Sequence, residues 1–342
     1  MLSRRQFVTT AVGGLAAAAA TRKSAKAKGR SELHIGVLPV MISPLWNAHA
    51  QGLFQKAGID VKFIVFQTGP SETAALQSGV IHLAWGGTIP FYSVRSNGAP
   101  IRWPATLGNY NGADGMVVGP NSPIKSVKDL AGKKIAVPFY TTVHGPLMLM
   151  LKAHGISSKD VQLINLAPPQ AAAAVLSGTA DAAMMWPPFT YEVVARGGRV
   201  LFHAKDTPGG GWSWTGFAAN DHWANANVEL LGRFYKIFDE GRADLEANRE
   251  RIVKTAVSVV GLPEGAARQE FAQLLFPPLV DNVVAGTRIS MCDAEQGKGI
   301  GLALDQARQF YQKVGAVKTP VSYSEYLSVK ALDKLYGKAC RV

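Results

Sequence analysis

The chain has 342 residues, of which 47% are hydrophobic, and its formal net charge is +12 at pH 7. This length can supply about two globular domains, and the composition excludes a disordered or fibrous chain. The positive charge does not indicate a nucleic-acid-binding surface, because seven of the 36 basic residues lie in the first thirty positions, where acidic residues are absent. The other 29 face 24 acidic residues, which leaves a net charge of +5 for the rest of the chain.

The first thirty residues have the pattern of a twin-arginine signal peptide. Residues 3–7, SRRQF, supply the paired arginines, and the charge-free run over 7–20 is shorter than the about 20 apolar residues of a membrane-spanning helix. We therefore expect export to the periplasm by the twin-arginine route, with residues 1–28 as the signal peptide. Cleavage after Ala20 and cleavage after Ala27 both remain open, and the alternative to a signal is a basic tail or an amphipathic surface helix.

Cys292 and Cys340 are the only cysteines of the chain. They could pair in an oxidising periplasm or stay buried and free. We expect no bond, because nothing in the sequence indicates that the two residues approach each other.

Beyond the leader, short apolar strands alternate with helices. Strands are predicted over residues 33–38, 61–66 and 80–85. Helices are predicted to end near Gly58, where glycine can adopt the left-handed cap, and to run from Thr68 to Gly79 and onward from Thr88. This order predicts an α/β fold with parallel strands.

The same plan recurs about a hundred residues later. KAGI at residues 56–59 is echoed by KAHGI at 152–156, and AALQSG at 74–79 is echoed by AAVLSG at 173–178. The order and spacing of these matches predict two similar α/β lobes. In open α/β sheets the ligand crevice lies beyond the carboxyl ends of the strands, so a small molecule should lie between the lobes.

One segment of the second lobe has the features of an anion-binding site. A predicted short apolar strand follows Lys133 and Lys134 and stops at Pro138, and Thr141 and Thr142 follow at the expected start of a helix. Free backbone N–H groups and the positive helix end would then point into the cleft, although a threonine that merely caps the helix is the alternative. Thr88 stands at a similar junction in the first lobe and should face this pair.

The remaining chain completes the two lobes. Residues 114–118 and 213–219 are predicted to cross between them, because turn-forming glycine and proline residues flank both stretches. Apolar residues at helical spacing then predict helices that return to the first lobe, over 227–245, 249–260, 263–274 and 295–314. The predicted organisation is a first lobe over 31–116, a second lobe over 117–214 and a helical return to the first lobe over 215–342.

Enzymatic motifs are not supported. The chain has no phosphate-binding loop, no HExxH zinc motif and no GxSxG nucleophile motif, and residues 297–302 depart from the dinucleotide-binding fingerprint. The seven histidines show no metal-ligand spacing, so we expect His144 to be a cleft-wall or packed residue rather than a base. No cofactor or metal is predicted.

Aromatic residues fall in or beside the predicted loops. They are Trp46, Tyr110, Trp186, Trp212 and Trp214. We expect Trp186 to form a wall of the cleft. For Trp212 and Trp214, which should point to one face of a strand, ligand contact and core packing both remain open.

Four segments together resemble a known family: 69–79 (GPSETAALQSG), 86–90 (GGTIP), 122–135 (SPIKSVKDLAGKKI) and 180–188 (ADAAMMWPP). Over nearly all of residues 33–320 the chain resembles the periplasmic solute-binding proteins of ABC importers for nitrate, aliphatic sulfonates and taurine. The related thiamine-pyrimidine-precursor-binding family is similar too. The resemblance implies a type II periplasmic-binding-protein fold, with two α/β lobes joined by two crossing strands around a ligand cleft.

The same resemblance implies a function. It indicates a monomeric extracytoplasmic protein that captures a small anionic or polar organic ligand and delivers it to an ABC permease in the membrane, without catalysis or nucleic-acid binding. Some proteins of this fold are desulfinases or pyrimidine synthases, but their chemistry needs cysteine near the cleft, and both cysteines lie far from the cleft loops in sequence. A transcription regulator of this fold would need a helix-turn-helix where the leader stands.

The candidate ligand-binding residues lie in the predicted cleft loops and helix starts. They are Ser43, Trp46, Thr68, Gly87, Thr88, Tyr110, Thr141, Thr142, His144 and Trp186. The family often has an acid between the tryptophan and the proline of the 186–188 loop, where this chain has Trp-Pro-Pro. Because the cleft loops named here contain no acid to hold an ammonium, we expect a sulfonate first, nitrate second and a neutral pyrimidine-like heterocycle third, rather than taurine.

Overall fold

The structure is a computed structural model that describes residues 30–38, 43–66, 69–208, 214–255, 257–258, 263–337 and 340. Residues 31–342 form one compact unit. The predicted signal peptide, Thr68 and Trp212 lie outside the described residues. Among the helices that are described, none combines the length and the apolar character needed to cross a membrane.

The first sheet has six strands, in the order β2-β1-β3-β11-β4 with β5 paired to β11. They are β1 (Ser31–Val37), β2 (Ile59–Val65), β3 (Leu83–Gly87), β4 (Ile101–Arg102), β5 (Thr106–Asn109) and β11 (Trp214–Asn220). As predicted, β1 runs parallel to β2 and β3, whereas β11 returns antiparallel to β3. Leu33, Ile35 and Val37 alternate along β1 and enter the core.

Four helices connect the first strands: α1 (Ser43–Ala50), α2 (Leu53–Lys56), α3 (Gly69–Gln77) and α4 (Thr88–Ser96). Gly58 has a φ of 71° directly after α2, which confirms the predicted left-handed turn into β2. The predicted start of a helix at Thr88 is also confirmed.

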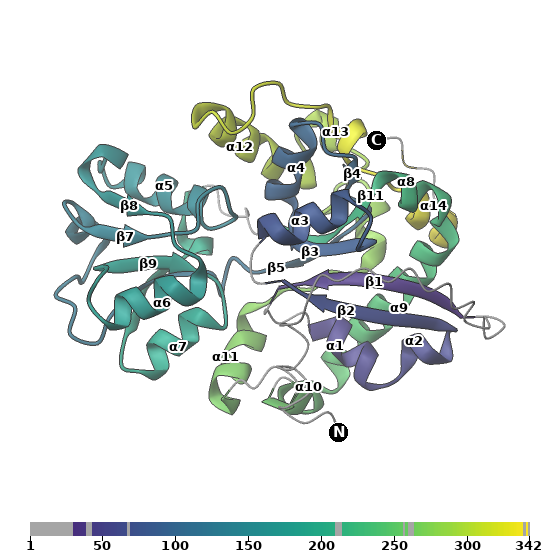
Figure 1. The fold of residues 1–342 in the computed structure, drawn as a ribbon, viewed down its shortest axis with the longest axis horizontal. Coiled ribbons are helices and arrows are strands. Elements are labelled where there is room, and N and C mark those ends of the chain that lie inside the picture. Colours follow the sequence, from purple (N-terminus) through teal and green to yellow (C-terminus); the bar gives the residue numbers. More distant parts are fainter. Residues whose placement is uncertain are drawn as a thin grey trace, which may run out of the picture. The chain divides into compact units, whose positions relative to one another are not determined.

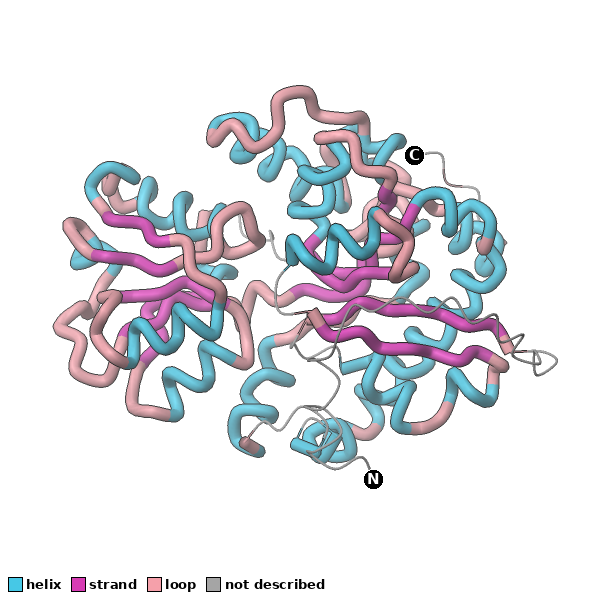
Figure 2. The backbone as a smooth tube through the Cα atoms, viewed as in Figure 1, coloured by secondary structure: helices cyan, strands magenta, loops and turns pink. Residues whose placement is uncertain are grey.

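The second sheet has five strands, in the order β10-β6-β9-β7-β8. They are β6 (Gly115–Val118), β7 (Lys134–Ala136), β8 (Gln162–Ile164), β9 (Ala182–Met185) and β10 (Arg199–His203). Met184 points into the core under α5 (His144–Ala153), whereas Met185 points into the core under α6 (Pro168–Leu176) and α7 (Phe189–Ala195). Helices therefore cover both faces of this sheet (Figures 1 and 2), which is why the central strands β6 and β9 are apolar and buried throughout.

The crossings between the sheets differ in detail from the prediction. β6 pairs with β9 and β10, all in the second sheet, and β11 pairs with strands of the first sheet only. A strand that is paired in this way lies within its sheet, so the stretches 114–118 and 213–219 are not themselves the crossings. The chain instead passes between the sheets at residues 110–114 and again between β10 and β11.

Helices follow β11 and return to the first sheet, as predicted. Their bounds are α8 (Asp221–Ala226), α9 (Val228–Ala247), α10 (Arg249–Thr255), α11 (Glu264–Gln273), α12 (Ile300–Lys313), α13 (Tyr323–Tyr326) and α14 (Lys330–Tyr336). Asn47 of α1 donates from Nδ2 to the carbonyl oxygen of Gly241 at 2.9 Å, which fixes α9 against α1. The helix α12 starts later than predicted because Gly297 and Gly299 have φ values of 69° and 55°.

Short 3₁₀ turns complete the described chain. They are η1 (Val127–Leu130), η2 (Ser158–Asp160), η3 (Ala204–Asp206), η5 (Leu279–Val283) and η6 (Ala294–Gln296). Ser157 caps η2 by accepting the N–H of Lys159 at 3.2 Å, as expected for serine at such a start.

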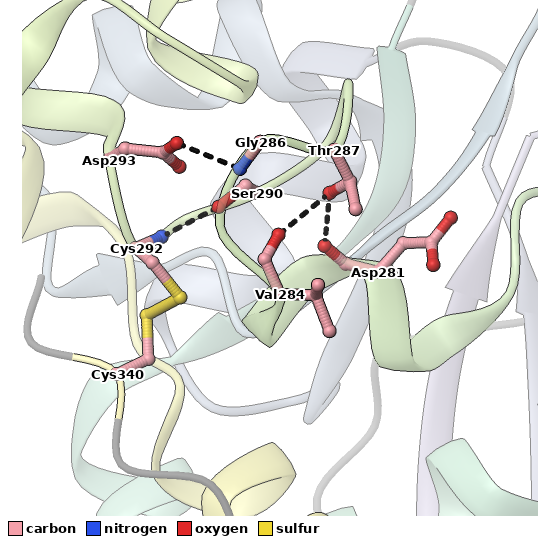
Figure 3. The surroundings of a disulfide bond; sticks show 8 residues. All are labelled: Asp281, Val284, Gly286, Thr287, Ser290, Cys292, Asp293 and Cys340. Atoms are coloured by element: carbon pink, nitrogen blue, oxygen red, sulfur yellow. Dashed lines mark hydrogen bonds between the residues drawn. A yellow bond between two sulfur atoms is a disulfide. The ribbon is translucent and has the colours of Figure 1, made fainter.

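Cys292 and Cys340 form a disulfide, so the expectation of two free thiols is wrong (Figure 3). Their Cα atoms are 5.1 Å apart although the residues are separated by 48 positions in the sequence. The loop before Cys292 is held by its own hydrogen bonds: Ser290 Oγ accepts the N–H of Cys292 at 3.2 Å, and Asp293 Oδ2 accepts the N–H of Gly286 at 3.0 Å. This loop receives the C-terminal cysteine, a meeting that sequence distance could not reveal.

Candidate ligand-binding cavity

A cavity of about 690 Å³ lies where strands of both sheets end. Its wall includes the residues at or directly after the carboxyl ends of five strands: Leu38 after β1, Gly87 in β3, Pro138 after β7, Asn165 after β8 and Trp186 after β9. This is the position at which open α/β sheets bind ligands, and the volume suits a small organic molecule.

Aromatic residues and prolines make up 13 of the 28 described residues that line the cavity. Both sheets contribute rings, and the aromatic wall residues are Trp85, Phe91, Tyr110, Phe139, Tyr140, Trp186 and Phe189. Hydroxyl and amide groups, including those of Thr73, Ser93, Thr142 and Asn165, are distributed among them. The site therefore combines apolar faces for the body of a ligand with a few polar groups that can fix its orientation.

Five of the predicted site residues lie together on this wall: Gly87, Tyr110, Thr141, Thr142 and Trp186. They come from segments far apart in the sequence and from both sheets, as the facing-lobe model requires. Of the five other candidates, Thr68 lies outside the described residues, and the side chain of Ser43 is likewise not described.

The turn before α5 differs from the prediction. The helix begins at His144, not at the threonines, and Thr141 donates its hydroxyl to the carbonyl oxygen of Pro138 at 2.7 Å. Thr141 thus holds the turn, whereas no described residue forms a hydrogen bond with the backbone N–H or the hydroxyl of Thr142. Because Thr142 also lines the cavity, it is the polar group of this turn that remains available to a ligand.

Thr142 meets Gly87 across the cavity. A Cβ atom added to Gly87 would lie 2.2 Å from Thr142 Cγ2 and 3.2 Å from Pro90 Cδ. Gly87 has a φ of −76° and a ψ of 140°, which any residue can adopt. Glycine is therefore needed here because a side chain would not fit, and not because of the backbone conformation. Gly87, and not the expected Thr88, is therefore the residue of the first sheet that meets Thr142.

His144 is a packed residue and does not line the cavity. Its ring stacks on Phe139 with centroids 4.9 Å apart, and its Nδ1 accepts the backbone N–H of Tyr140 at 3.2 Å. Burial lowers the pKa of His144 to about 4, so the ring is neutral at pH 7. Of the two roles left open, cleft wall or packed residue, the structure shows the second.

Thr88 and Trp46 also point away from the cavity. Thr88 is fully buried at the first turn of α4, where its carbonyl oxygen accepts the hydroxyl of Tyr326 at 2.6 Å. The Trp46 ring packs on Phe63 with centroids 4.8 Å apart. In both cases tertiary packing determines the direction of the side chain, which position beside a loop cannot predict.

The expectation that the cleft contains no acid is wrong. Glu72 and Asp114 both line the cavity, and both are buried. Glu72 lies in the first turn of α3, one helical turn before the buried Leu76, so helical spacing could have placed it on the inward face. By contrast, the described wall contains no lysine, arginine or histidine.

The sequence comparison supplies the family. The model of the NMT1/THI5-like family matches residues 40–251. The chain belongs to the NMT1/THI5-like family.

Relatives of this NMT1/THI5-like protein include several binding proteins. It is 30% identical over 206 residues to a putative aliphatic sulfonates-binding protein of Escherichia coli (strain K12), covering 59% of this chain and 63% of the relative. It is 29% identical over 235 residues to the taurine-binding periplasmic protein of the same organism, covering 65% and 71%. The chain thus spans less than two thirds of the sulfonates-binding relative.

Solved structures show the fold. The alkanesulfonate-binding protein SsuA from Xanthomonas axonopodis pv. citri, bound to MOPS, superposes with a TM-score of 0.72 at 22% identity, covering 88% of this chain and 99% of that one. The desulfurization enzyme DSZB superposes with a TM-score of 0.67 at 18% identity, covering 90% and 99%. The NMT1/THI5-like chain therefore has the periplasmic-binding-protein fold, which binding proteins and an enzyme share.

Proposed function

We propose that this protein is an extracytoplasmic solute-binding protein that captures a small organic ligand and delivers it to the permease of an ABC importer. The observation that carries the proposal is the aromatic cavity of about 690 Å³ at the facing strand ends of two sheets. The family, the fold and the sulfonate- and taurine-binding relatives support it.

The ligand carries an anionic group, and an organic sulfonate is our first choice. Thr142 offers a hydroxyl and a backbone N–H to an anion, and the rings of Trp85 and Trp186 offer faces to an apolar body. Nitrate, the second choice, would leave most of a cavity of about 690 Å³ unfilled. A neutral pyrimidine-like heterocycle stacked on Trp186 remains the third choice.

Closure of two lobes captures the ligand in this proposal. In this proposal the lobes are the parts that carry the two sheets, residues 31–109 with 214–342 and residues 115–203, and the chain passes between the sheets in two short connections. Closure would bring the two sheets together until Thr142 meets Gly87, the contact already present in this structure. X-ray scattering should show a smaller radius of gyration at saturating ligand, and an unchanged profile would count against closure.

We propose the periplasm as the site of action, reached through the twin-arginine leader. The Cys292–Cys340 disulfide supports an oxidising compartment, since such bonds are rare in proteins that stay in the cytosol. The protein would act there as a monomer whose partners are the ligand and the permease, with no part in nucleic-acid binding.

An enzyme of the same fold is the second candidate, because DSZB shares the fold. A cysteine nucleophile at the cavity is not supported, since both cysteines are joined in the disulfide and neither is part of the described cavity wall. Incubation of the purified protein with an aryl sulfinate, followed by assay for sulfite, separates the two candidates. Release of sulfite over many turnovers would favour the enzyme.

A calorimetric screen of the mature protein tests the proposed function directly. The ligands are alkane- and arylsulfonates, taurine, nitrate and pyrimidines at equal concentration. We expect sub-micromolar binding of at least one organic sulfonate. A preference for nitrate or for a pyrimidine over every sulfonate would contradict the choice of ligand and leave a binding function in place.

A further inference from the structure

Glu72 places a carboxyl group in the cavity wall. Only 1% of the residue is exposed, and its Oε1 accepts the backbone N–H of Trp85 at 3.1 Å. No described residue bonds to its second oxygen, Oε2. One carboxyl oxygen is therefore fixed to the edge of β3, and the other is left for a ligand.

The elements packed around Glu72 bring no charge to it. β1 presents Gly36, where an added Cβ would lie 3.1 Å from Glu72 Oε1, and the turn before β3 presents Ile81. The other ionisable side chains of the described cavity wall are Asp114, Tyr110 and Tyr140. Among the described residues of the cavity wall, carboxyl groups and aromatic faces are thus present and lysine, arginine and histidine are not.

We propose that Glu72 binds a positively charged nitrogen on the ligand, so that the ligand carries a protonated amine as well as the anionic group assigned above. The inference rests on the proposed function and makes its ligand class narrower. A carboxylate beside the rings of Trp85 and Trp186 suits an organic ammonium, because the ring faces attract a cation too. An anion without a nitrogen would find no favourable charge at this end of the cavity.

Binding of such a cation has a measurable consequence for protons. Burial raises the pKa of Glu72 well above its usual value, and the bond from the Trp85 N–H opposes this shift. In the empty cavity the raised pKa leaves the Glu72 carboxyl protonated up to a higher pH than an ordinary glutamate. When the ammonium binds, the protonated fraction of Glu72 releases its proton to solvent, so at pH values below the pKa of Glu72 the affinity should increase about tenfold for each unit by which the pH is raised.

Four ligands built on one propyl chain test the contributions of the two charged groups separately: 3-aminopropanesulfonate, propanesulfonate, propylamine and 1-propanol. The same set on a tolyl body, with 4-(aminomethyl)benzenesulfonate as the doubly charged member, covers a ligand that fills more of the cavity. Calorimetry at pH 6, 7 and 8, in two buffers of different ionisation enthalpy, gives the affinity and the number of protons released. The proteins are the wild type, Glu72→Gln and Glu192→Gln, which changes an exposed carboxylate paired with Arg196.

We expect the aminosulfonate to bind at least tenfold more tightly than the matching sulfonate, with a net release of protons that grows as the pH is lowered from 8 to 6. Glu72→Gln, which keeps an acceptor for the Trp85 N–H, should remove the preference and the pH dependence, and Glu192→Gln should keep both. Equal or tighter binding of the nitrogen-free sulfonate by the wild type overturns the inference and leaves the proposed function intact. Binding of propylamine without any benefit from the sulfonate supports the inference and overturns the proposed anion. Absence of binding by every nitrogen-bearing ligand overturns the inference, and the wild-type data decide even if Glu72→Gln fails to fold.

Discussion

Tyr311 donates its hydroxyl to the backbone carbonyl oxygen of Tyr140 at 2.7 Å, which ties α12 to the turn that lines the cavity. Tyr311 is fully buried, whereas Tyr140 is 48% exposed and has a φ of 60°. A residue with a side chain rarely adopts this left-handed conformation, so the bond from Tyr311 helps to hold an unfavourable backbone geometry at the cavity wall. The late helix α12 thus belongs to the support of the site.

Removal of this hydroxyl should loosen the turn. We expect Tyr311→Phe to lower the free energy of unfolding by about 1 kcal/mol and to weaken ligand binding, because a largely buried hydrogen bond is lost. Urea denaturation and calorimetry measure the two effects. Tyr235→Phe is the matched control: Tyr235 is also fully buried, but its hydroxyl has no hydrogen-bond partner among the described residues, so its loss should be neutral or stabilising. Similar losses in both variants would contradict a role for the Tyr140 contact.

Gly87→Ala tests the close approach of the two strand ends. The new methyl group would overlap Thr142 Cγ2, so we expect the sheets to be held apart and ligand affinity to fall at least tenfold, while the fold is retained. Gly69→Ala is the control at the same cavity, since a Cβ there meets nothing within 4 Å. Unchanged affinity in Gly87→Ala would show that Thr142 can move aside without cost.

Thr142→Val should weaken an anionic ligand. Valine keeps the shape of threonine and removes only the hydroxyl, and a hydrogen bond to a charged group is worth about 1.5–3 kcal/mol, so affinity should fall at least tenfold. Thr142→Pro, which removes the backbone donor as well, should have a larger effect. Calorimetry with the best sulfonate of the screen measures both. If the anion binds Thr142→Val as tightly as it binds the wild type, then the hydroxyl of Thr142 is not part of the anion-binding site.

His144 should make stability depend on pH. Its pKa is about 4 in the folded chain against 6.5 ordinarily, so the unfolded chain binds more protons between these values. Stability is therefore unaffected by this group above pH 6.5, falls as the pH drops from 6.5 to 4 and is constant below. The loss is at most about 3 kcal/mol, since one pKa unit corresponds to about 1.4 kcal/mol. Urea denaturation at pH 7 and pH 4.5 should show a smaller difference for His144→Gln than for the wild type, and an equal difference would assign the loss to other groups.

The arrangement of the elements could largely be predicted from the sequence, because it follows from local signals. Apolar runs predict the strands, glycines such as Gly58 mark where helices end, and the crevice rule places the cavity at the strand ends. Each of these signals involves only a few neighbouring residues, so it can be read without knowledge of the tertiary contacts.

The direction of individual side chains could not be predicted in the same way. Thr88 and His144 lie beside cavity loops, but their side chains pack away from the cavity. Thr88 packs against Tyr326, which is distant in the sequence, and the ring of His144 stacks on Phe139, a contact that depends on the path of the turn between them. Glu72 was missed because an acid in the first turn of a helix is usually exposed: its spacing from Leu76 indicates the inward face of α3, but only the packing of α3 brings that face to the cavity. Tertiary packing, not local propensity, decides these three positions.

Export can be tested on the leader. We expect replacement of Arg4 and Arg5 by lysine together to leave the full-length precursor in the cytoplasm, because the paired arginines are the recognition element of the proposed twin-arginine signal. Cell fractionation with immunoblotting detects the precursor and the processed chain. Normal periplasmic processing of the double variant would contradict the twin-arginine assignment.

The Cys292–Cys340 disulfide also gives each molecule a chemical record of where it has been. A chain kept in the reducing cytosol should carry two thiols that an alkylating reagent can modify after denaturation, whereas an exported chain should carry none. Mass spectrometry of the intact chain can read this difference in a single sample, without separating the compartments. The redox state of Cys292 and Cys340 thus reports whether the leader has directed that molecule out of the cytosol.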